Sequence, residues 1–278
     1  MNEHCASRLH GIWALTNREL KKWYKAPVIF LLSIIQPIIW MGLLGKAMNI
    51  GALIPNIPGS EIDPATILRE TLGTGDYFSF MSVGMIAFTA LFTTMFSGMS
   101  IVWDRRLGFL NKVLSTPVSR AVIIFSKVLS ATLRSMFQAS IIIVFAVILG
   151  LQFGPTFNPL NILGVFAILF LICVGLSSLF IAITIRSTRI ETPMAVVNLI
   201  TLPLMFASNA FFPTGFMPSW LQTVAKFNPM TYTTDAVRQL LIFSTDYTQL
   251  AMDFVYVGIF ASVVAVIGIV LSWRFLTK

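Results

Sequence analysis

The chain has 278 residues, of which 56% are hydrophobic and only 11% are charged, and its mean hydropathy is +0.85. Soluble domains carry about 25% charged residues, so this composition argues against a soluble protein and places the chain in the membrane class. The formal net charge of +8 is then no sign of nucleic-acid binding, because its meaning depends on which side of a bilayer the basic residues occupy.

Residues 1–26 are predicted to form a separate amphipathic segment on the inner membrane surface. Leu9, Trp13 and Trp23 supply apolar and aromatic groups, while Lys21 and Lys22 can meet anionic head groups. An ordinary basic flank of the first membrane span remains the alternative interpretation.

Residues 27–278 are predicted to form an all-α, polytopic domain with six membrane spans. Each apolar run has about the 20 residues that a bilayer core requires. The six runs cover residues 28–48, 77–102, 134–153, 160–185, 192–212 and 254–273. An even number of spans puts both termini on the same side of the membrane.

The basic residues are divided unequally between the two sides of these spans. One side holds four acidic residues and fifteen of the 19 Lys and Arg residues. Those fifteen are Arg8, Arg18, Lys21, Lys22, Lys25, Arg105, Arg106, Lys112, Arg120, Lys127, Arg134, Arg186, Arg189, Arg274 and Lys278. The positive-inside rule therefore predicts that both termini are cytoplasmic.

The connection between the second and third spans, residues 103–120, is basic and amphipathic. Leu107, Leu110 and Leu114 recur at helical spacing, and Pro117 ends the predicted helix. A simple loop does not need an apolar stripe, so we expect a short helix at the membrane surface that presses on another protein. A solvated basic loop is the alternative.

The segment between the last two spans, residues 213–253, is too apolar for an exposed loop. Residues 218–227 and 230–243 are each predicted to form a short helix that dips into the outer leaflet. The first external segment, residues 49–76, is rich in Pro and Gly and is predicted to be a true loop.

Motifs for chemistry are missing from the sequence. It contains no Gly-x-x-x-x-Gly-Lys-Ser/Thr loop, no His-Glu-x-x-His pair and no Gly-x-Ser-x-Gly turn. We therefore expect no catalytic, cofactor-binding or metal-ligating residue in this chain. The centres of the spans hold no charged residue, which argues against a proton- or sodium-coupled carrier.

Polar and aromatic side chains within the spans are the candidates for a substrate path. They are Gln36, Phe88, Phe92, Phe96 and Asn198, and the three phenylalanines recur at every fourth position. Packing between helices is the competing interpretation for each of them. Charge-free spans rich in Phe and Met suit an amphipathic or lipid-linked cargo better than an ion.

Two motifs in this chain resemble those of type 2 ABC exporter permeases, a family that includes daunorubicin-resistance and polysaccharide-export permeases. The first motif comprises Asp104, Arg105, Arg106, Gly108, Leu110, Leu114, Pro117 and Arg120. The second comprises Asn209, Pro213, Pro218, Asn228, Pro229, Tyr232, Asp235 and Arg238. The family often has Glu before the glycine of the first motif, where this chain has Leu107.

The resemblance implies an all-helical exporter subunit of the plasma membrane. It implies that the first motif, with Leu107, couples the chain to a separate ATP-binding cassette subunit that holds Mg-ATP, and that the second forms an external re-entrant element. A second copy of the chain, membrane lipid and an amphipathic small molecule, lipid or glycan are the other implied partners, and nucleic acid is not. The alternatives are a membrane assembly or anchoring protein without transport and, less favoured, a secondary carrier.

Overall fold

The computed structural model describes residues 8–47, 72–116, 118–187, 189 and 191–277, and the regular structure within them is entirely helical. The elements in chain order are α1 (Arg8–Tyr24), α2 (Pro27–Trp40), the π-helix η1 (Met41–Ala47), α4 (Tyr77–Arg106), α5 (Phe109–Leu114), α6 (Arg120–Ile148), α7 (Asn161–Thr184), α8 (Glu191–Phe206), the 3₁₀ turn η3 (Thr214–Phe216), α9 (Ser219–Phe227), α10 (Pro229–Leu241) and α11 (Tyr247–Thr277). The predicted all-α fold class is confirmed for these residues. The predicted loop at 49–76 lies largely outside them.

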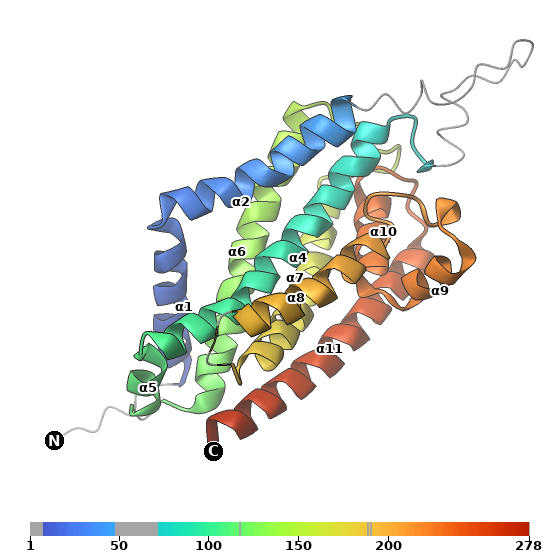
Figure 1. The fold of residues 1–278 in the computed structure, drawn as a ribbon. Helices are drawn as coiled ribbons and strands as arrows, with labels where there is room; N and C mark the ends of the chain where they lie inside the picture. The colour runs from blue at the N-terminus through green and yellow to red at the C-terminus, as the bar shows by residue number, and fades with distance from the viewer. Residues whose placement is uncertain (1–7, 48–71, 117, 188, 190, 278) are drawn as a thin grey trace, which may run out of the picture.

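Four long helices form the body of the molecule. α4, α6, α7 and α11 run side by side in Figure 1, with α7 in contact with each of the other three. These are the four described helices that are long and apolar enough to cross a membrane. The remaining two predicted spans correspond to α2 with η1 and to α8, which are shorter apolar helices.

Several helices extend beyond the predicted spans. α6 begins at Arg120, fourteen residues before the predicted third span, and α11 begins at Tyr247, seven residues before the predicted last span. In the sequence, charged residues near the starts of α6 and α11 interrupt the apolar runs and so shorten the predicted spans. In the structure the helices continue past these charged residues, because other helices of the bundle supply polar partners for their side chains.

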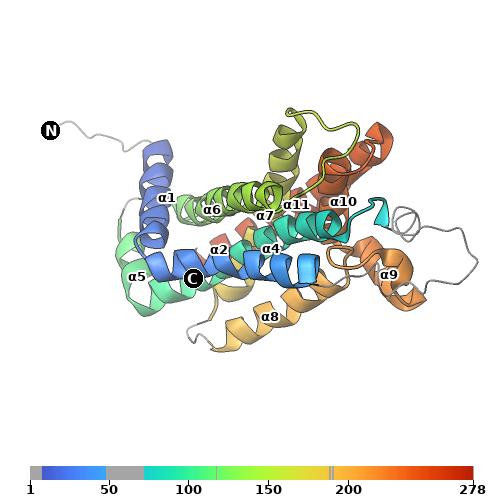
Figure 2. The same ribbon diagram turned by 90° about the horizontal axis from the view of Figure 1, so that it is seen from above.

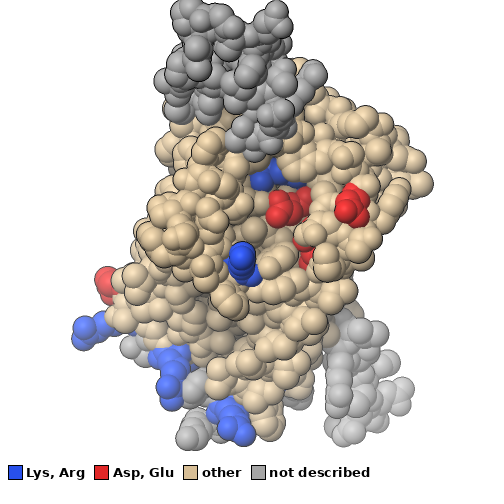
Figure 3. Space-filling view, turned by 90° about the vertical axis from the view of Figure 1, so that its right-hand side faces the viewer, with Lys and Arg blue, Asp and Glu red and all other residues tan. Residues whose placement is uncertain are grey.

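The two ends of the bundle carry different elements. Figure 1 places α5 and the C-terminus at one end, and α9 and α10 toward the other. Figure 2 shows α6 and α8 on opposite sides of α4, which contacts both. On the face in Figure 3, most Lys and Arg atoms lie near the lower end and most Asp and Glu atoms in the upper half.

The apolar core is divided in the same way. A large cluster around α4 and α7 fills the middle of the bundle and the α10 end, and it includes Phe80, Ile168 and Val237. A smaller cluster lies at the α5 end and includes Ile101, Leu110 and Ile124. The described helices thus bury their apolar faces against each other at both ends of the molecule.

Local sequence explains where α4 begins and ends. The side-chain carboxylate of Asp76 accepts hydrogen bonds from the backbone N–H groups of Phe78 and Ser79, both at 3.2 Å, and so caps the first turn. Gly108 has a φ of +71°, a left-handed conformation that residues with a Cβ rarely adopt, and it separates α4 from α5.

Candidate functional site

Five charged side chains from α1, α4 and α6 meet near the α5 end of the bundle, and we call them the ion cluster. They are Arg18, Glu19, Lys22, Asp104 and Lys127. Glu19, Asp104 and Lys127 are each at most 4% exposed. Buried charges of this kind persist only when they are paired, because an isolated charge in a low-dielectric interior is costly.

The pairing within the ion cluster is dense. Asp104 forms ion pairs with Lys127, with Lys22 Nζ at 2.7 Å and with Arg18 Nη2 at 3.3 Å. Glu19 Oε1 lies 3.0 Å from Lys127 Nζ, 3.0 Å from Lys22 Nζ and 2.8 Å from Arg18 Nη1. Both carboxylates therefore contact all three cations, and the cluster keeps one positive charge in excess.

α5 packs directly against this cluster. The guanidinium carbon of Arg18 lies 3.2 Å from the centre of the Phe109 ring, a cation–π contact. Leu110 and Val113 are 3% and 8% exposed and belong to the smaller apolar cluster. Because α1 carries Arg18 and packs along α6, the N-terminal helix, α5 and the start of α6 form one connected unit.

The predicted continuous helix through Leu107, Leu110 and Leu114 is wrong in one respect. Gly108 breaks it, so that Leu107 follows the last turn of α4 and is 74% exposed, while Leu110 points into the protein. Leu114 is half-buried. Leu110 is therefore apolar because it packs inside this protein. It is not available to contact a partner protein.

The surface that this connection leaves open is mainly polar. Arg106, Asn111 and Lys112 are exposed around Leu107, and Arg105 and Arg120 are half-buried. Pro117, the predicted stop of the helix, lies outside the described residues. Two large apolar side chains of this connection face outward, Leu107 next to the basic residue Arg106 and, one turn earlier on α4, the half-exposed Trp103.

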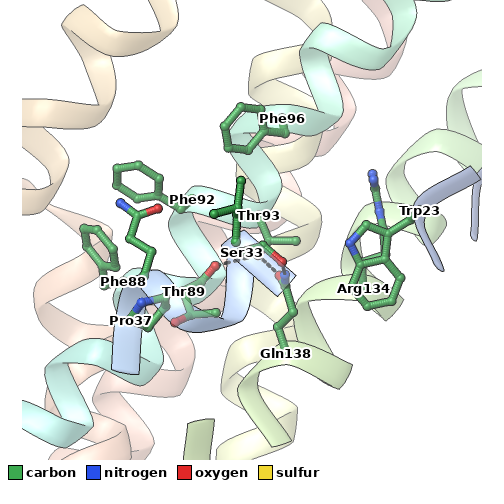
Figure 4. Close-up of a pocket in the computed structure, with 12 residues that line it drawn as sticks. Trp23, Ser33, Pro37, Phe88, Thr89, Phe92, Thr93, Phe96, Arg134 and Gln138 are labelled. Carbon is green, nitrogen blue, oxygen red and sulfur yellow. Dashed lines mark hydrogen bonds between the residues drawn. The ribbon is translucent and has the colours of Figure 1, made fainter. Parts of the chain in front are cut away.

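A cavity of about 240 Å³ lies between α2, α4 and α6 (Figure 4). Four of the five predicted path residues line it, namely Gln36, Phe88, Phe92 and Phe96. The rings of Phe88 and Phe92 are 4.3 Å apart. Residues four positions apart lie on the same face of a helix, so the three phenylalanines form one wall of the cavity.

A side-chain amide joins the three helices around this cavity. Gln138 on α6 donates to the hydroxyl of Ser33 on α2 and accepts a hydrogen bond from the hydroxyl of Thr93 on α4. These groups are polar but uncharged, so they can link helices within a membrane at modest cost. The cavity is therefore bounded by a fixed polar contact.

Asn198 does not share this location. It lies exposed on α8 and is not among the residues that line the cavity. The structure therefore does not bring Asn198 together with the three phenylalanines, and its place in a substrate path stays a prediction.

The second motif fastens α10 to the end of α8. Asn228 Oδ1 accepts from the backbone N–H of Met230 at 2.9 Å and caps α10, which begins at Pro229. Asn228 Nδ2 donates to the carbonyls of Leu204 and Ala207 at 2.9 and 2.8 Å. One side chain therefore satisfies free backbone groups at the end of one helix and the start of the next.

The other motif residues support the turns around this junction. The two predicted short helices correspond to α9 and α10, and Pro218 is the N-cap residue of α9. Pro213 directly precedes η3. The Tyr232 hydroxyl donates to the carbonyl of Lys226 at 2.7 Å, and its ring stacks 3.9 Å from that of Tyr256 on α11.

Arg238 on α10 is fully buried beside this junction. Its Nη2 donates to the carbonyl of Ala210 at 3.1 Å, and its guanidinium lies 3.6 Å from the centre of the Phe80 ring. Burial lowers the pKa of Arg238 to about 10, and the nearby Asp235 carboxylate opposes the shift. Asp235 in turn accepts a hydrogen bond from Asn209. Arg238 is thus held between a backbone carbonyl and an aromatic ring, close to the carboxylate of Asp235.

Sequence reasoning missed the partners of these charges. In the sequence, Glu19 is a single acidic residue within a basic segment. In the structure it pairs with Lys127, which lies on a different helix. Glu19 could have been identified as unusual, because it is the single acidic residue among Arg18, Lys21 and Lys22. A basic segment that only contacts water and lipid head groups gains nothing from a carboxylate at that position. No local pattern indicates which residue it meets.

In the described residues, a helical bundle with four helices long and apolar enough to cross a membrane is typical of a multi-pass membrane protein. The model of the ABC-2 type transporter family matches residues 10–242. The chain therefore belongs to the ABC-2 type transporter family.

Named relatives agree with this family. The chain is 31% identical to ycf38 of Cyanophora paradoxa, a transport permease by name, over 90% of this chain and 82% of the relative. It is 34% identical to ycf38 of Pyropia yezoensis over 84% and 75% of the two chains. It is 23% identical to the daunorubicin resistance ABC transporter permease protein DrrB1 of Streptomyces coeruleorubidus over 60% and 59%.

The family assignment fixes the class of molecule. The chain is the membrane component of an ABC transporter, a permease that is not itself an enzyme, and its family works with an ATP-binding subunit. The resemblance seen in the two sequence motifs is confirmed by the match.

Proposed function

We propose that this chain is an exporter permease that moves an amphipathic small molecule, lipid or glycan across the plasma membrane. A separate ATP-binding cassette subunit would hold Mg-ATP and supply the energy, and a second copy of the chain would complete the path. The family match over residues 10–242 carries the proposal. The absence of a phosphate-binding loop from the sequence supports the division of labour.

The proposed topology has six spans with both termini in the cytoplasm. Residues 27–47 form the continuous pair α2 and η1, and 21 residues at 1.5 Å each reach about 30 Å, the thickness of a bilayer core. α8 reaches only about 24 Å by the same measure, so the turns after it would complete the fifth crossing. The excess of basic residues near α5 supports a cytoplasmic location for that end.

Labelling of single cysteines tests this topology. In a variant without the native Cys5 and Cys173, a cysteine at Thr223, which is exposed on α9, should react with a membrane-impermeant maleimide added outside intact cells. A cysteine at Lys112 on α5 should react only after permeabilisation. Labelling of position 112 in intact cells would contradict the proposed orientation.

Coupling to the ATP-binding subunit is assigned to the surface around the break between α4 and α5. Leu107 is 74% exposed at a position within a basic rim formed by Arg106 and Lys112. An apolar side chain held open at the end of a long helix suits insertion into a partner's apolar pocket, while the rim charges guide encounter. Since Leu110 and Val113 anchor α5, movement of this surface would be passed to α1, α4 and α6.

The variant Leu107→Asp tests both the function and the coupling surface. Purified with its ATP-binding subunit in proteoliposomes, the wild-type chain should support ATP-driven export, and the isolated chain should hydrolyse no ATP. Leu107→Asp should reduce the co-purified ATP-binding subunit about tenfold, because it removes one apolar anchor from the interface. Export should fall with it.

Two control variants separate coupling from folding. Leu107→Met keeps an apolar side chain and should retain the complex. Leu110→Asp places a charge in the smaller apolar cluster and should instead lower the yield of folded protein. ATP turnover by the isolated chain would refute the proposed function, whereas normal export by Leu107→Asp would move the coupling role to another surface.

A further inference from the structure

Arg134 is a cationic side chain that lines the cavity and forms no ion pair with a carboxylate in the described part of the chain. Its Nε donates to the carbonyl of Ser130 at 3.3 Å, and no Asp or Glu in the described part of the chain lines the cavity. The acidic group that acts on its charge is Glu19, and both Glu19 and Asp104 already contact the three cations of the ion cluster. A guanidinium has five N–H donors, so most of those of Arg134 are available to a ligand.

The cavity is polar at one side and apolar at the other. Figure 4 shows Phe88, Phe92 and Phe96 along one wall, and Trp23 and Arg134 together on the opposite side. Phe96 follows Phe88 by eight residues on α4, which corresponds to a rise of about 12 Å. A ligand with a charged head and an apolar body would match both walls.

The depth of Arg134 suits the same kind of ligand. Fourteen residues separate Arg134 from Ile148, the end of α6, a rise of about 21 Å against a bilayer core of about 30 Å. With the end of α6 at one boundary of the core, Arg134 lies within about 10 Å of the other. Long basic side chains and tryptophans reach lipid head groups from this depth.

We propose that the cavity binds the anionic head of an amphiphile, a phosphate ester or a carboxylate, at Arg134. The apolar body of the ligand lies along the phenylalanine wall, and Trp23 covers the head-group side. This inference rests on the proposed function, because it names the class of molecule that enters the path from the inner leaflet. Charge-assisted hydrogen bonds from a guanidinium give it both strength and direction.

Fluorescence quenching of Trp23 by brominated lipids tests this site. The full chain is placed in phosphatidylcholine vesicles that contain a small fraction of either dibromo-acyl phosphatidylglycerol or dibromo-acyl phosphatidylcholine. The quenching that disappears in Trp23→Phe is the signal from the cavity. Wild type should show about a tenfold preference for the anionic lipid, the value expected for a hydrogen bond to a charged group.

Substitutions at Arg134 then identify the group responsible. Arg134→Gln should abolish the preference, Arg134→Lys should keep most of it, and Lys112→Gln, which removes an exposed cation on α5, should leave it unchanged. A monodisperse size-exclusion profile confirms that each variant is folded. Equal quenching by both lipids in wild type, or an unchanged preference in Arg134→Gln, would overturn the inference.

Competitors distinguish an amphiphile from a simple anion or a surrounding lipid. Dodecyl phosphate should displace the brominated anionic lipid, whereas inorganic phosphate at the same concentration should not. Displacement by inorganic phosphate, or none by dodecyl phosphate, would overturn the proposed ligand class. If export continues while Arg134→Gln keeps its lipid preference, this inference alone fails. If the site behaves as expected but the chain never associates with an ATP-binding subunit, only the proposed function fails.

Discussion

Asparagine in place of Asp104 should lower the free energy of unfolding by about 3–5 kcal/mol, the cost of removing one partner from a buried ion pair. Asp104 is 2% exposed and contacts Arg18, Lys22 and Lys127. Asp104→Asn keeps the shape of the side chain but leaves three cations facing the single carboxylate of Glu19. Thermal unfolding in detergent micelles should show a fall in Tm of roughly 10 °C.

Two further variants isolate the electrostatic cause. Glu191→Gln removes an exposed carboxylate at the start of α8 and should cost less than about 1 kcal/mol. Asp104→Asn combined with Lys127→Met should be more stable than Asp104→Asn alone, because it removes a buried cation together with its anion. Strictly additive losses would show that the two side chains do not interact.

Alanine in place of Gly84 should have an effect of comparable size at the α10 end. A Cβ at this position would lie 1.9 Å from the carbonyl oxygen of Ala210, which also accepts the hydrogen bond from Arg238. Backbone cannot move aside as a flexible side chain can, so we expect a loss of about 3 kcal/mol or more, the upper part of the range for overpacking.

Gly258→Ala provides the matched control for this substitution. Gly258 lies in α11, and its added Cβ would meet no heavy atom within 4 Å. The alanine should leave stability unchanged or raise it by up to about 1 kcal/mol, because alanine favours a helix over glycine. Thermal unfolding of both variants under the same conditions checks the difference, and similar Tm values would contradict the close approach of α4 to Ala210.

Periodicity and length predicted the helices of this chain better than they predicted its contacts. The apolar run at residues 160–185 corresponds almost residue for residue to α7, because a helix buried among helices is apolar along its whole length. Tyr77 also begins a helix as predicted, since Asp76 is a good capping residue immediately before it.

Tertiary packing decided what the pattern left open. The spacing of Leu107, Leu110 and Leu114 predicts a helix with an apolar side, but it cannot say whether a partner or the chain itself covers that side. The left-handed conformation of Gly108 divides the stripe, but a glycine in sequence does not by itself show whether it ends a helix or lies within one. For the candidate site, the phenylalanine wall was predictable from its helical repeat. The role of Arg134 was not predictable, because it lacks a carboxylate partner only as a result of the ion pairs that Glu19 and Asp104 form with Arg18, Lys22 and Lys127.

The order of the ion cluster along the chain bears on biosynthesis. Lys127 lies 21 residues before the end of α6, about 31 Å along the helix, and therefore at the inner boundary of the bilayer core, where it is buried against the bundle. Both of its acidic partners, Glu19 and Asp104, precede it in the sequence and are therefore synthesised first. Both carboxylates are thus already present when α6 packs onto α1 and α4, so that Lys127 is paired as soon as it is buried.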